Sequence, residues 1–94
     1  MATFTWNEEK NEKLQRERGL SFEELVAALK AGGLLANIPH PNQHTYPHQR
    51  ILIVNMNSYA YEIPCISEDN DIFLITAFPS RRATQRYLRG KERK

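Results

Sequence analysis

The chain has 94 residues, a formal net charge of +2, 40% apolar residues and 26% charged residues, which is ordinary for a soluble globular protein. This length allows one domain with a modest core and no second domain. No apolar run approaches the roughly 18 residues of a membrane-spanning helix, and the single Cys65 excludes an internal disulfide. The first ten residues lack a basic stretch followed by an apolar one, so we expect no secretory signal. We therefore expect one cytoplasmic domain over 1–94 with no membrane association.

The N-terminal part of the chain is predicted to form a short strand and then a helix. Phe4 and Trp6 alternate with threonines, which is typical of a strand. Residues 7–18 are rich in helix-forming side chains, and Asn7 is an acceptable N-cap before two acids. Gly19 is a typical residue after the last helical turn. The first helix is therefore expected to end there.

A second helix is indicated by the capping-box pattern of Ser21 and Glu24. An apolar stripe at helical spacing follows, formed by Phe22, Leu25, Val26 and Leu29. The pair Gly32 and Gly33 ends this helix. Residues 34–38 could form a strand, and the polar stretch that follows contains three prolines and is predicted to be a loop.

The second half of the chain contains three strand-like runs, at 50–56, 59–63 and 72–78. The first two are separated by two residues, which is hairpin distance. Ser80 can cap a closing helix over 81–89. The order strand, two helices, three or four antiparallel strands and helix predicts an α+β sandwich, with the helices packed on one side of a curved sheet.

Positive charge is concentrated in the segment from Ser80 onward. Seven cations and one acid, Glu92, give this segment a net charge of +6, so the rest of the chain carries about −4. The cations are Arg81, Arg82, Arg86, Arg89, Lys91, Arg93 and Lys94. Such asymmetry indicates contact with a polyanion or an acidic partner. The alternative is a solvated terminus without a ligand, and residues 89–94 are expected to be flexible.

Three histidines, His40, His44 and His48, share a spacing of four residues. On a helix this spacing would stack three imidazoles on one face, but the prolines in this stretch forbid a regular helix. No carboxylate or thiol within the stretch completes a zinc site. We therefore predict neither a metal nor a cofactor here, and a surface loop with unrelated histidines. A single catalytic or RNA-contacting histidine is the alternative.

Arg81 and Arg82 are the leading candidates for phosphate contact. They occupy the first turn of the closing helix, where free N–H groups and the helix dipole favour an anion. Two guanidinium groups there could stabilise the phosphorane formed when a 2′-OH attacks an RNA phosphate. That reaction also needs a base and an acid, for which His48, Glu62, Lys10 or a tyrosine are candidates, and it requires no metal.

Four tyrosines are interleaved with arginines, as in proteins that bind single-stranded RNA by base stacking and phosphate contacts. Tyrosine is also common in strand cores, so a structural role for Tyr59 and Tyr61 stays open. Glu62 lies on the opposite strand face, where it could be solvated, pair with an arginine or act as a general base. The residues assigned to RNA binding are Lys10, Tyr46, Arg50, Tyr61, Arg86 and Tyr87.

Several motifs resemble those of bacterial toxins. "FTWNEEKNEKLQRERGLSFEE" is similar to the opening of BrnT-type toxins, in which a Phe-x-Trp-Asp-x-x-Lys run leads to a Lys-His-Gly turn and a Phe-Glu-Glu helix. "PSRRATQRY" resembles the Ser-Ala-Arg-Arg-Ala-Thr segment that opens their last helix. The "YPxQ" loop, the "YAY" strand and the "PSRxATxxYL" ending are similar to a group of small bacterial toxin-like proteins in which they recur together.

The resemblance implies a RelE/ParE-like fold and the toxin of a type II toxin–antitoxin pair. Such a toxin would be a metal-independent endoribonuclease that cuts mRNA, free or on the ribosome, and a small DNA-binding antitoxin would neutralise it. By position, Lys10, Arg81 and Arg82 match the family's basic residues, whereas Arg18 replaces its His and Leu14 its Asn. The alternative is a non-catalytic toxin-like module that binds an antitoxin or nucleic acid through its basic closing helix.

Overall fold

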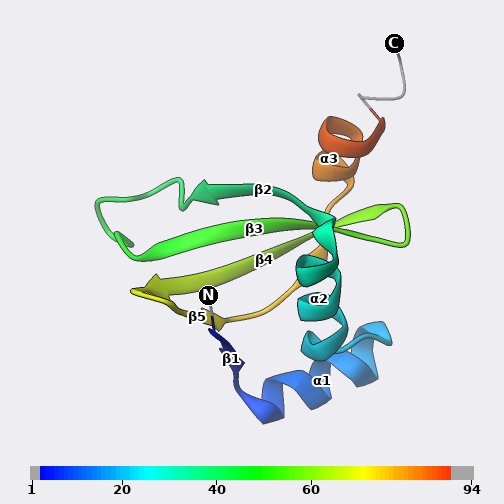
Figure 1. The fold of residues 1–94 in the computed structure, drawn as a ribbon, viewed down its shortest axis with the longest axis horizontal. Helices are drawn as coiled ribbons and strands as arrows, with labels where there is room; N and C mark the ends of the chain where they lie inside the picture. The colour runs from blue at the N-terminus through cyan, green and yellow to red at the C-terminus, as the bar shows by residue number, and fades with distance from the viewer. Residues whose placement is uncertain (1–2, 90–94) are drawn as a thin grey trace.

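The computed structural model describes residues 3–89, so the predicted flexible tail lies, from residue 90 on, outside the described residues. In chain order the elements are β1 (Thr3–Trp6), α1 (Glu8–Arg18), α2 (Phe22–Ala28), the π-helical turn η1 (Leu29–Gly33), β2 (Leu34–Pro39), β3 (Gln49–Met56), β4 (Tyr59–Glu68), β5 (Asp71–Leu74), β6 (Phe78–Pro79), α3 (Arg81–Ala83) and its π-helical continuation η2 (Thr84–Arg89). The α+β class predicted from the sequence is confirmed (Figure 1). No helix within 3–89 is long and apolar enough to cross a membrane.

The strands form one mixed sheet in the order β1-β5-β4-β3-β2. The strands from β2 to β5 pair in antiparallel fashion, as predicted. The sheet is larger than the three or four antiparallel strands predicted after the helices, because the N-terminal strand β1 joins its edge parallel to β5. β1 and β5 are far apart in the sequence, and the residue pattern of neither strand predicts that they pair.

The run 72–78, predicted as one strand, is divided in the structure. β5 and β6 both pair with the same edge of β4, but residues 75–77 between them leave the ladder as a bulge. Pro64 of β4 lies opposite this break: its carbonyl accepts from the Ile75 N–H at 2.9 Å, and a proline has no N–H to return. A bulge is the usual place for a proline within a sheet.

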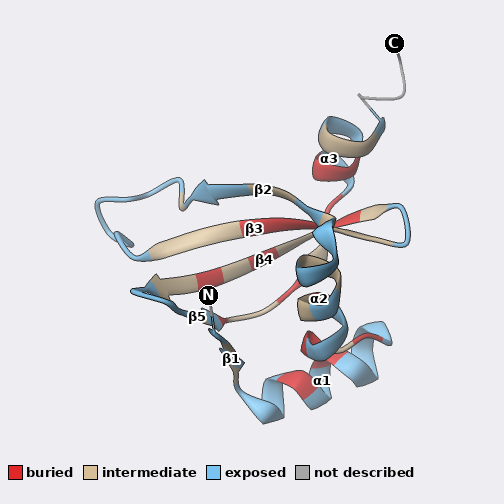
Figure 2. Ribbon diagram, in the orientation of Figure 1, coloured by how far each residue is buried: buried red, intermediate tan, exposed pale blue. Residues whose placement is uncertain are grey.

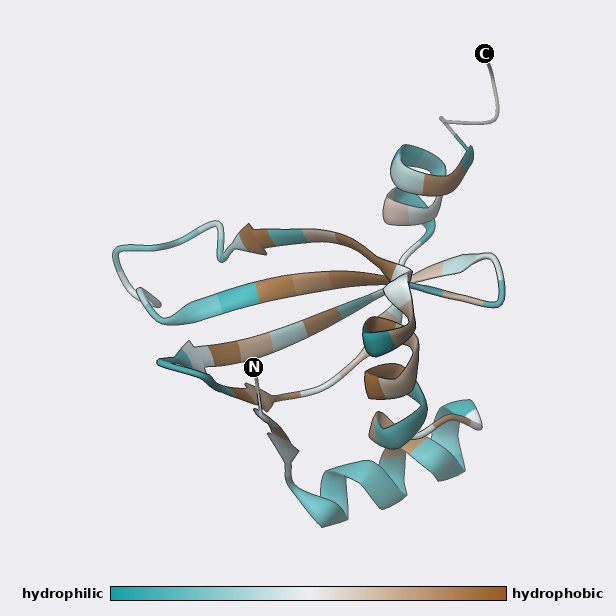
Figure 3. Cartoon of the chain, in the orientation of Figure 1, coloured by the Kyte–Doolittle hydropathy of each residue, from teal (hydrophilic) through white to brown (hydrophobic). Residues whose placement is uncertain are grey.

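The helices cover both faces of the sheet, which corrects the prediction that they pack on one side. α1 and α2 cover one face, while α3 packs on the other against Ile53 and Ala60 (Figure 1). Successive side chains of β3 point to opposite faces of the sheet, which explains why helices pack on both faces. Leu52 and Val54 point toward α2, and Ile53 points toward α3. The buried segments of β3 and β4 in Figure 2 overlap with their apolar stretches in Figure 3, whereas apolar residues of β2 at the sheet edge are exposed.

α1 and α2 are held together by a buried amide. The Asn11 side chain is 1% exposed, accepts from the Phe22 N–H at 2.8 Å and donates to the Glu23 carboxylate at 2.8 Å. The capping box predicted for α2 forms, since the Ser21 hydroxyl accepts from the Glu24 N–H and the Glu24 carboxylate accepts from the Ser21 N–H. The two bonds of Asn11 thus join α1 to the first turn of α2.

Candidate functional site: a groove along helix α1

Three adjoining hollows follow α1 from its first turn to its last. Their volumes are about 350 Å³ beside Phe73, about 140 Å³ beside residues 76–78 and about 300 Å³ near the β3–β4 hairpin. Lys10 and Lys13 line the first and second hollows, and Arg18 lines the second and third. We name the three hollows together the α1 groove.

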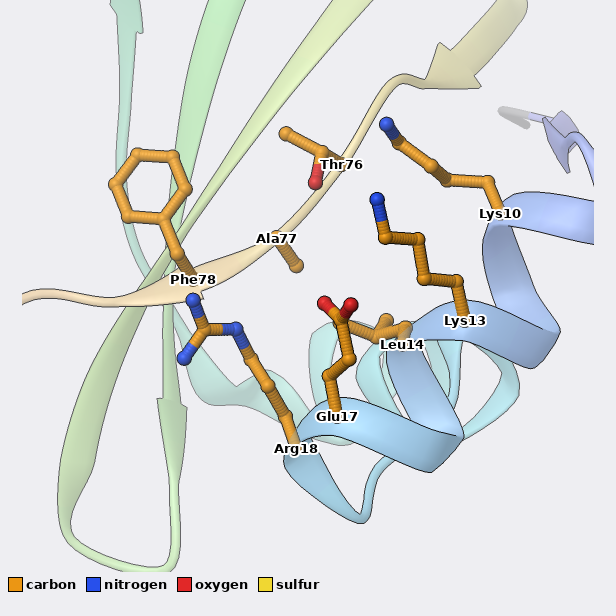
Figure 4. A pocket seen from close by; sticks show the side chains of 8 residues that line it. All are labelled: Lys10, Lys13, Leu14, Glu17, Arg18, Thr76, Ala77 and Phe78. Atoms are coloured by element: carbon orange, nitrogen blue, oxygen red, sulfur yellow. The ribbon is translucent and has the colours of Figure 1, made fainter.

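One face of α1 supplies the charged wall of the groove. Its members are Lys10, Lys13, Leu14, Glu17 and Arg18, spaced i, i+3, i+4, i+7 and i+8, which places them on one side of a helix. Leu14 is 6% exposed and anchors the wall in the core. In Figure 4 the lysine and arginine side chains extend toward the segment 76–78, and the Glu17 carboxylate lies between Lys13 and Arg18. Three cations and one carboxylate thus line the same hollow.

The opposite wall is made by the segment that leaves the β-ladder at the Pro64 bulge. Thr76 and Ala77 line the middle hollow, and their short side chains leave space that a larger residue would fill. Phe78 follows in β6 and is half-buried at the end of this hollow. The segment between β5 and β6 thus forms the wall of the middle hollow that faces α1.

Aromatic rings lie at intervals along the groove. Phe73 is 39% exposed and lines the first hollow. Tyr59 and Tyr61 line the third, with their ring centroids 6.3 Å apart in an edge-to-face arrangement. Single-stranded nucleic acid is bound in this way, with cations along the backbone and aromatic rings that stack on bases.

The α1 groove contains only two of the residues selected from the sequence, Lys10 and Tyr61. Sequence analysis did not assign Lys13 or Glu17 a role, and it treated Arg18 only as a departure from the BrnT-type pattern. The available signal was their spacing around the apolar position 14, which puts all of them on the helix face that meets the sheet.

A second basic surface is formed by α3 and η2. Arg81, Arg82, Arg86 and Arg89 are all exposed, and we name them the α3 arginine face. The Arg86 guanidinium carbon lies 5.7 Å from the centre of the Tyr87 ring. Glu62, half-buried and paired in register with Ile53 and Phe78, lies on the same face of the sheet as α3. These five predicted residues, Arg81, Arg82, Glu62, Arg86 and Tyr87, thus share one side of the molecule.

The helix that carries the α3 arginine face is tied firmly to β4. The Ser80 hydroxyl accepts from the Ala83 N–H at 3.1 Å, which confirms Ser80 as the N-cap. The Thr84 hydroxyl donates to the Ser80 carbonyl at 2.8 Å and accepts from the Ala60 N–H at 2.9 Å. The position of Arg81 and Arg82 is therefore fixed relative to the start of β4.

His48 and Tyr46 lie at the other end of the sheet, in the β2–β3 loop. The His48 carbonyl accepts from the Ser67 N–H, whereas the Ser80 N–H donates to the Ala60 carbonyl. Ala60 and Ser67 are seven positions apart on β4, a separation of about 23 Å along a strand. Figure 1 shows the loop and α3 at opposite ends of the sheet. The structure therefore does not bring His48 together with Arg81, as the predicted site required.

The β2–β3 loop has its own network of hydrogen bonds. The Gln43 side-chain amide donates to the carbonyls of His40 at 3.0 Å and Gln49 at 3.3 Å, and the His40 and Tyr46 rings are 4.6 Å apart. At the end of the loop, Arg50 Nε donates to the Asn37 side chain at 2.6 Å. This arginine, predicted to bind RNA, holds β2 to β3. Among residues 3–89, no three His, Cys, Asp or Glu side chains are grouped to hold a metal ion.

Cys65 is not a candidate nucleophile. It is 1% exposed and belongs to the core between the sheet and the helices α1 and α2. Burial raises the pKa of the Cys65 thiol, so the thiol stays protonated near neutral pH. A protonated, inaccessible thiol neither attacks a substrate nor binds a metal.

No family model matches this chain, and neither the curated proteins nor the solved structures give a match. Its chemistry is therefore inferred from its own surfaces. The α1 groove combines three cations, three carboxylates (Glu9, Glu17 and Glu24) and aromatic rings, whereas the α3 arginine face combines cations with a single half-buried carboxylate.

Proposed function

We propose that this protein is the toxin of a type II toxin–antitoxin pair, a metal-independent endoribonuclease that acts on mRNA in the cytoplasm and has a RelE/ParE-like fold. The α1 groove is its RNA site. The observation that carries the proposal is the Glu17 carboxylate among Lys10, Lys13 and Arg18 in the middle hollow. The sequence motifs that resemble BrnT-type toxins support the same reading, and a small DNA-binding antitoxin is the expected partner.

The groups in the middle hollow suit RNA cleavage by internal attack. Glu17 accepts the proton of the ribose 2′-OH, and the 2′-oxygen attacks the adjacent phosphorus. The bond from phosphorus to the 5′-oxygen breaks, and the Lys13 ammonium donates a proton to that oxygen. The products are a 2′,3′-cyclic phosphate and a 5′-OH. Lys10 and Arg18 stabilise the extra negative charge of the pentacovalent transition state.

Glu17 is better placed for this role than the residues predicted from the sequence. His48 lies about 23 Å along β4 from the start of α3 and lines no part of the groove. Glu62 lies on the opposite sheet face from the groove tyrosine Tyr61. Arg81 and Arg82, on the α3 arginine face, are proposed instead to hold flanking RNA or ribosomal RNA by phosphate contacts.

Cleavage of a labelled single-stranded RNA in the presence of a chelator tests the proposal. The wild-type protein is expected to leave 2′,3′-cyclic phosphate ends, and a substrate with 2′-deoxyribose at the cleaved position is expected to stay intact. Glu17→Gln should lower the cleavage rate by about 100-fold or more, because general bases contribute roughly 10²–10⁴-fold. It should not weaken RNA binding.

Glu12→Gln is the matched control, because Glu12 is an exposed residue of α1 outside the groove. It changes the charge of the protein equally and is expected to leave cleavage unchanged. Wild-type protein that cuts no RNA, with or without ribosomes, would contradict the proposal. Full activity of Glu17→Gln would show that the carboxylate has no part in the reaction.

The alternative is a non-catalytic module that binds an antitoxin or nucleic acid through the α3 arginine face. It is favoured by the composition of that helix, in which residues 81–89 contain four arginines and no acid. Under this reading, Arg81→Ala/Arg82→Ala weakens binding of RNA or of an acidic peptide, and the wild-type protein has no cleavage activity to lose.

A further inference from the structure

We propose that the third hollow of the α1 groove is a base-reading site that prefers a nucleobase with hydrogen-bond donors on its Watson–Crick edge, guanine above all. This inference rests on the proposed function and adds a specificity to it. The residues that carry it are Glu24, Tyr59, Tyr61 and Arg18. None of them takes part in the proton transfers proposed for the middle hollow.

The third hollow has the size and the boundaries of a small binding site. Its volume of about 300 Å³ is at the lower end of the roughly 300–1,000 Å³ of ligand pockets. The end of α1, the first turn of α2 and the β3–β4 hairpin enclose it. Three separate elements thus meet around it, so the distances between its walls are set by the fold.

One wall of the hollow can stack on a base. Tyr59 and Tyr61 are half-buried, and their rings meet edge to face at a centroid distance of 6.3 Å. Met56 lies beside them and adds a polarisable surface. Alanine substitution of a stacking aromatic residue typically weakens binding of each base about 5- to 150-fold, and stacking itself does not distinguish the four bases.

Glu24 supplies the discrimination that stacking lacks. Its carboxylate Oε1 accepts from the Ser21 N–H at 2.8 Å, so the capping box holds the carboxylate in place. The other carboxylate oxygen, Oε2, can accept a hydrogen bond from a ligand. A carboxylate accepts hydrogen bonds and donates none. Guanine offers two neighbouring donors, an N–H and an amino group, whereas the single N–H of uracil lies between two carbonyl acceptors.

Arg18 connects base recognition to cleavage. It lines both the middle and the third hollow, so a phosphate bound by its guanidinium lies between the two. The base read by Glu24 therefore belongs to a nucleotide next to the cleaved bond, and base preference in binding should reappear as sequence preference in cleavage.

Binding of short RNAs to the inactive Glu17→Gln protein tests this inference. The probes are fluorescent pentauridines whose central residue is G, A, C or U, and the readout is fluorescence anisotropy. The G probe is expected to bind about tenfold more tightly than the U probe, within the usual range for one good base contact. The A and C probes, with one amino group each, should lie between them.

Glu24→Gln is the decisive variant. Glutamine can replace glutamate in a capping box, so α2 is retained, but an amide group takes the place of one carboxylate oxygen and brings donors to the site. The preference for G over U should fall to within about twofold. Glu12→Gln, which removes a charge elsewhere, should keep the full preference. Tyr61→Leu should weaken all four probes alike.

Equal binding of the four probes by the Glu17→Gln protein overturns the inference, as does a preference that survives in Glu24→Gln. If Glu24→Gln does not fold, a Tyr61→Leu protein that binds G as tightly as its parent also overturns it. The outcomes are separable from those of the proposed function. If the protein prefers guanine but the wild type cleaves no RNA, this inference is supported and the proposed endoribonuclease activity is contradicted. If the wild type cleaves RNA but the protein shows no base preference, the endoribonuclease activity is supported and this inference is contradicted.

Discussion

Asn11 is the single residue on which the position of the groove wall depends most. Its side chain joins α1 to the first turn of α2 through two hydrogen bonds of 2.8 Å, one to the Phe22 N–H and one to the Glu23 carboxylate. The Phe22 side chain beneath this contact is fully buried. Because Lys10, Lys13 and Glu17 are fixed to the same helix, loss of this amide would affect the fold and the site together.

Asn11→Ala is expected to lower the free energy of unfolding by about 2 kcal/mol, since it leaves the buried N–H of Phe22 without a partner. Urea denaturation measures the change. Gln15→Ala, at an exposed position of the same helix, should change the free energy of unfolding by less than about 0.5 kcal/mol. Equal effects of the two substitutions would contradict the role given to Asn11.

The same contact makes part of the stability depend on pH. The hydrogen bond from Asn11 is the main cause that lowers the pKa of Glu23 below its usual 4.5. A lowered folded-state pKa stabilises the fold above the usual pKa, and this contribution is lost as the pH falls through the folded-state value. The difference in stability between the wild type and Asn11→Ala should therefore shrink as the pH is lowered from 6 to 3. A difference that grows in acid would contradict this assignment.

At the scale of elements, α3 is positioned by one hydroxyl. The Thr84 side chain accepts from the Ala60 N–H of β4 and donates to the Ser80 carbonyl, and Thr84 is 1% exposed. Ala83 packs beside it on Ile53 and Ala60. The short helix is stabilised by these contacts with the sheet, because an isolated helix of this length is not stable in water.

Thr84→Val keeps the shape of the side chain but removes both hydrogen bonds. We expect a loss of about 2 kcal/mol in the free energy of unfolding, because the Ala60 N–H stays buried without an acceptor. Thermal and urea denaturation measure it, with the exposed neighbour change Gln85→Ala as control. A stability equal to that of the wild type would show that α3 does not depend on this bond.

α1 is the element that carries the RNA backbone in the proposed function. Lys10 and Arg18 are eight residues apart, about 12 Å along the helix. Each phosphate contact with single-stranded RNA contributes about 0.7 to the slope of log K against log salt. Lys10→Ala should therefore reduce that slope by about 0.7. Lys30→Ala, an exposed lysine outside the α1 groove, should leave it unchanged, and equal slopes for the two variants would place the RNA elsewhere.

At the scale of the whole molecule, local patterns predicted the elements but not how they meet. The capping box at Ser21, the stop at Gly19 and the Asn57–Ser58 hairpin turn were readable because each depends on a few neighbouring residues. The parallel pairing of β1 with β5 and the placement of α3 on the second face depend on contacts far apart in the sequence, and no local pattern reports them.

The candidate site was harder to predict for the same reason. The sequence analysis selected Arg81 and Arg82 because positive charge is most concentrated in that part of the sequence. The middle hollow of the α1 groove is visible only in the structure, where Thr76 and Ala77, between the ladders of β5 and β6, line it together with Lys13 and Glu17. Lys10, Lys13 and Arg18, dispersed along the sequence, then line one hollow together.

The measurement that tests the central claim most directly is growth of bacteria on induction of the wild type, Glu17→Gln and Glu12→Gln, with the lengths of transcripts read alongside. The account predicts arrest and shortened mRNA for the wild type and Glu12→Gln, and normal growth with intact mRNA for Glu17→Gln at equal protein levels. Normal growth with intact mRNA for the wild type, or arrest that persists in Glu17→Gln, would contradict the assignment of the α1 groove as a ribonuclease site.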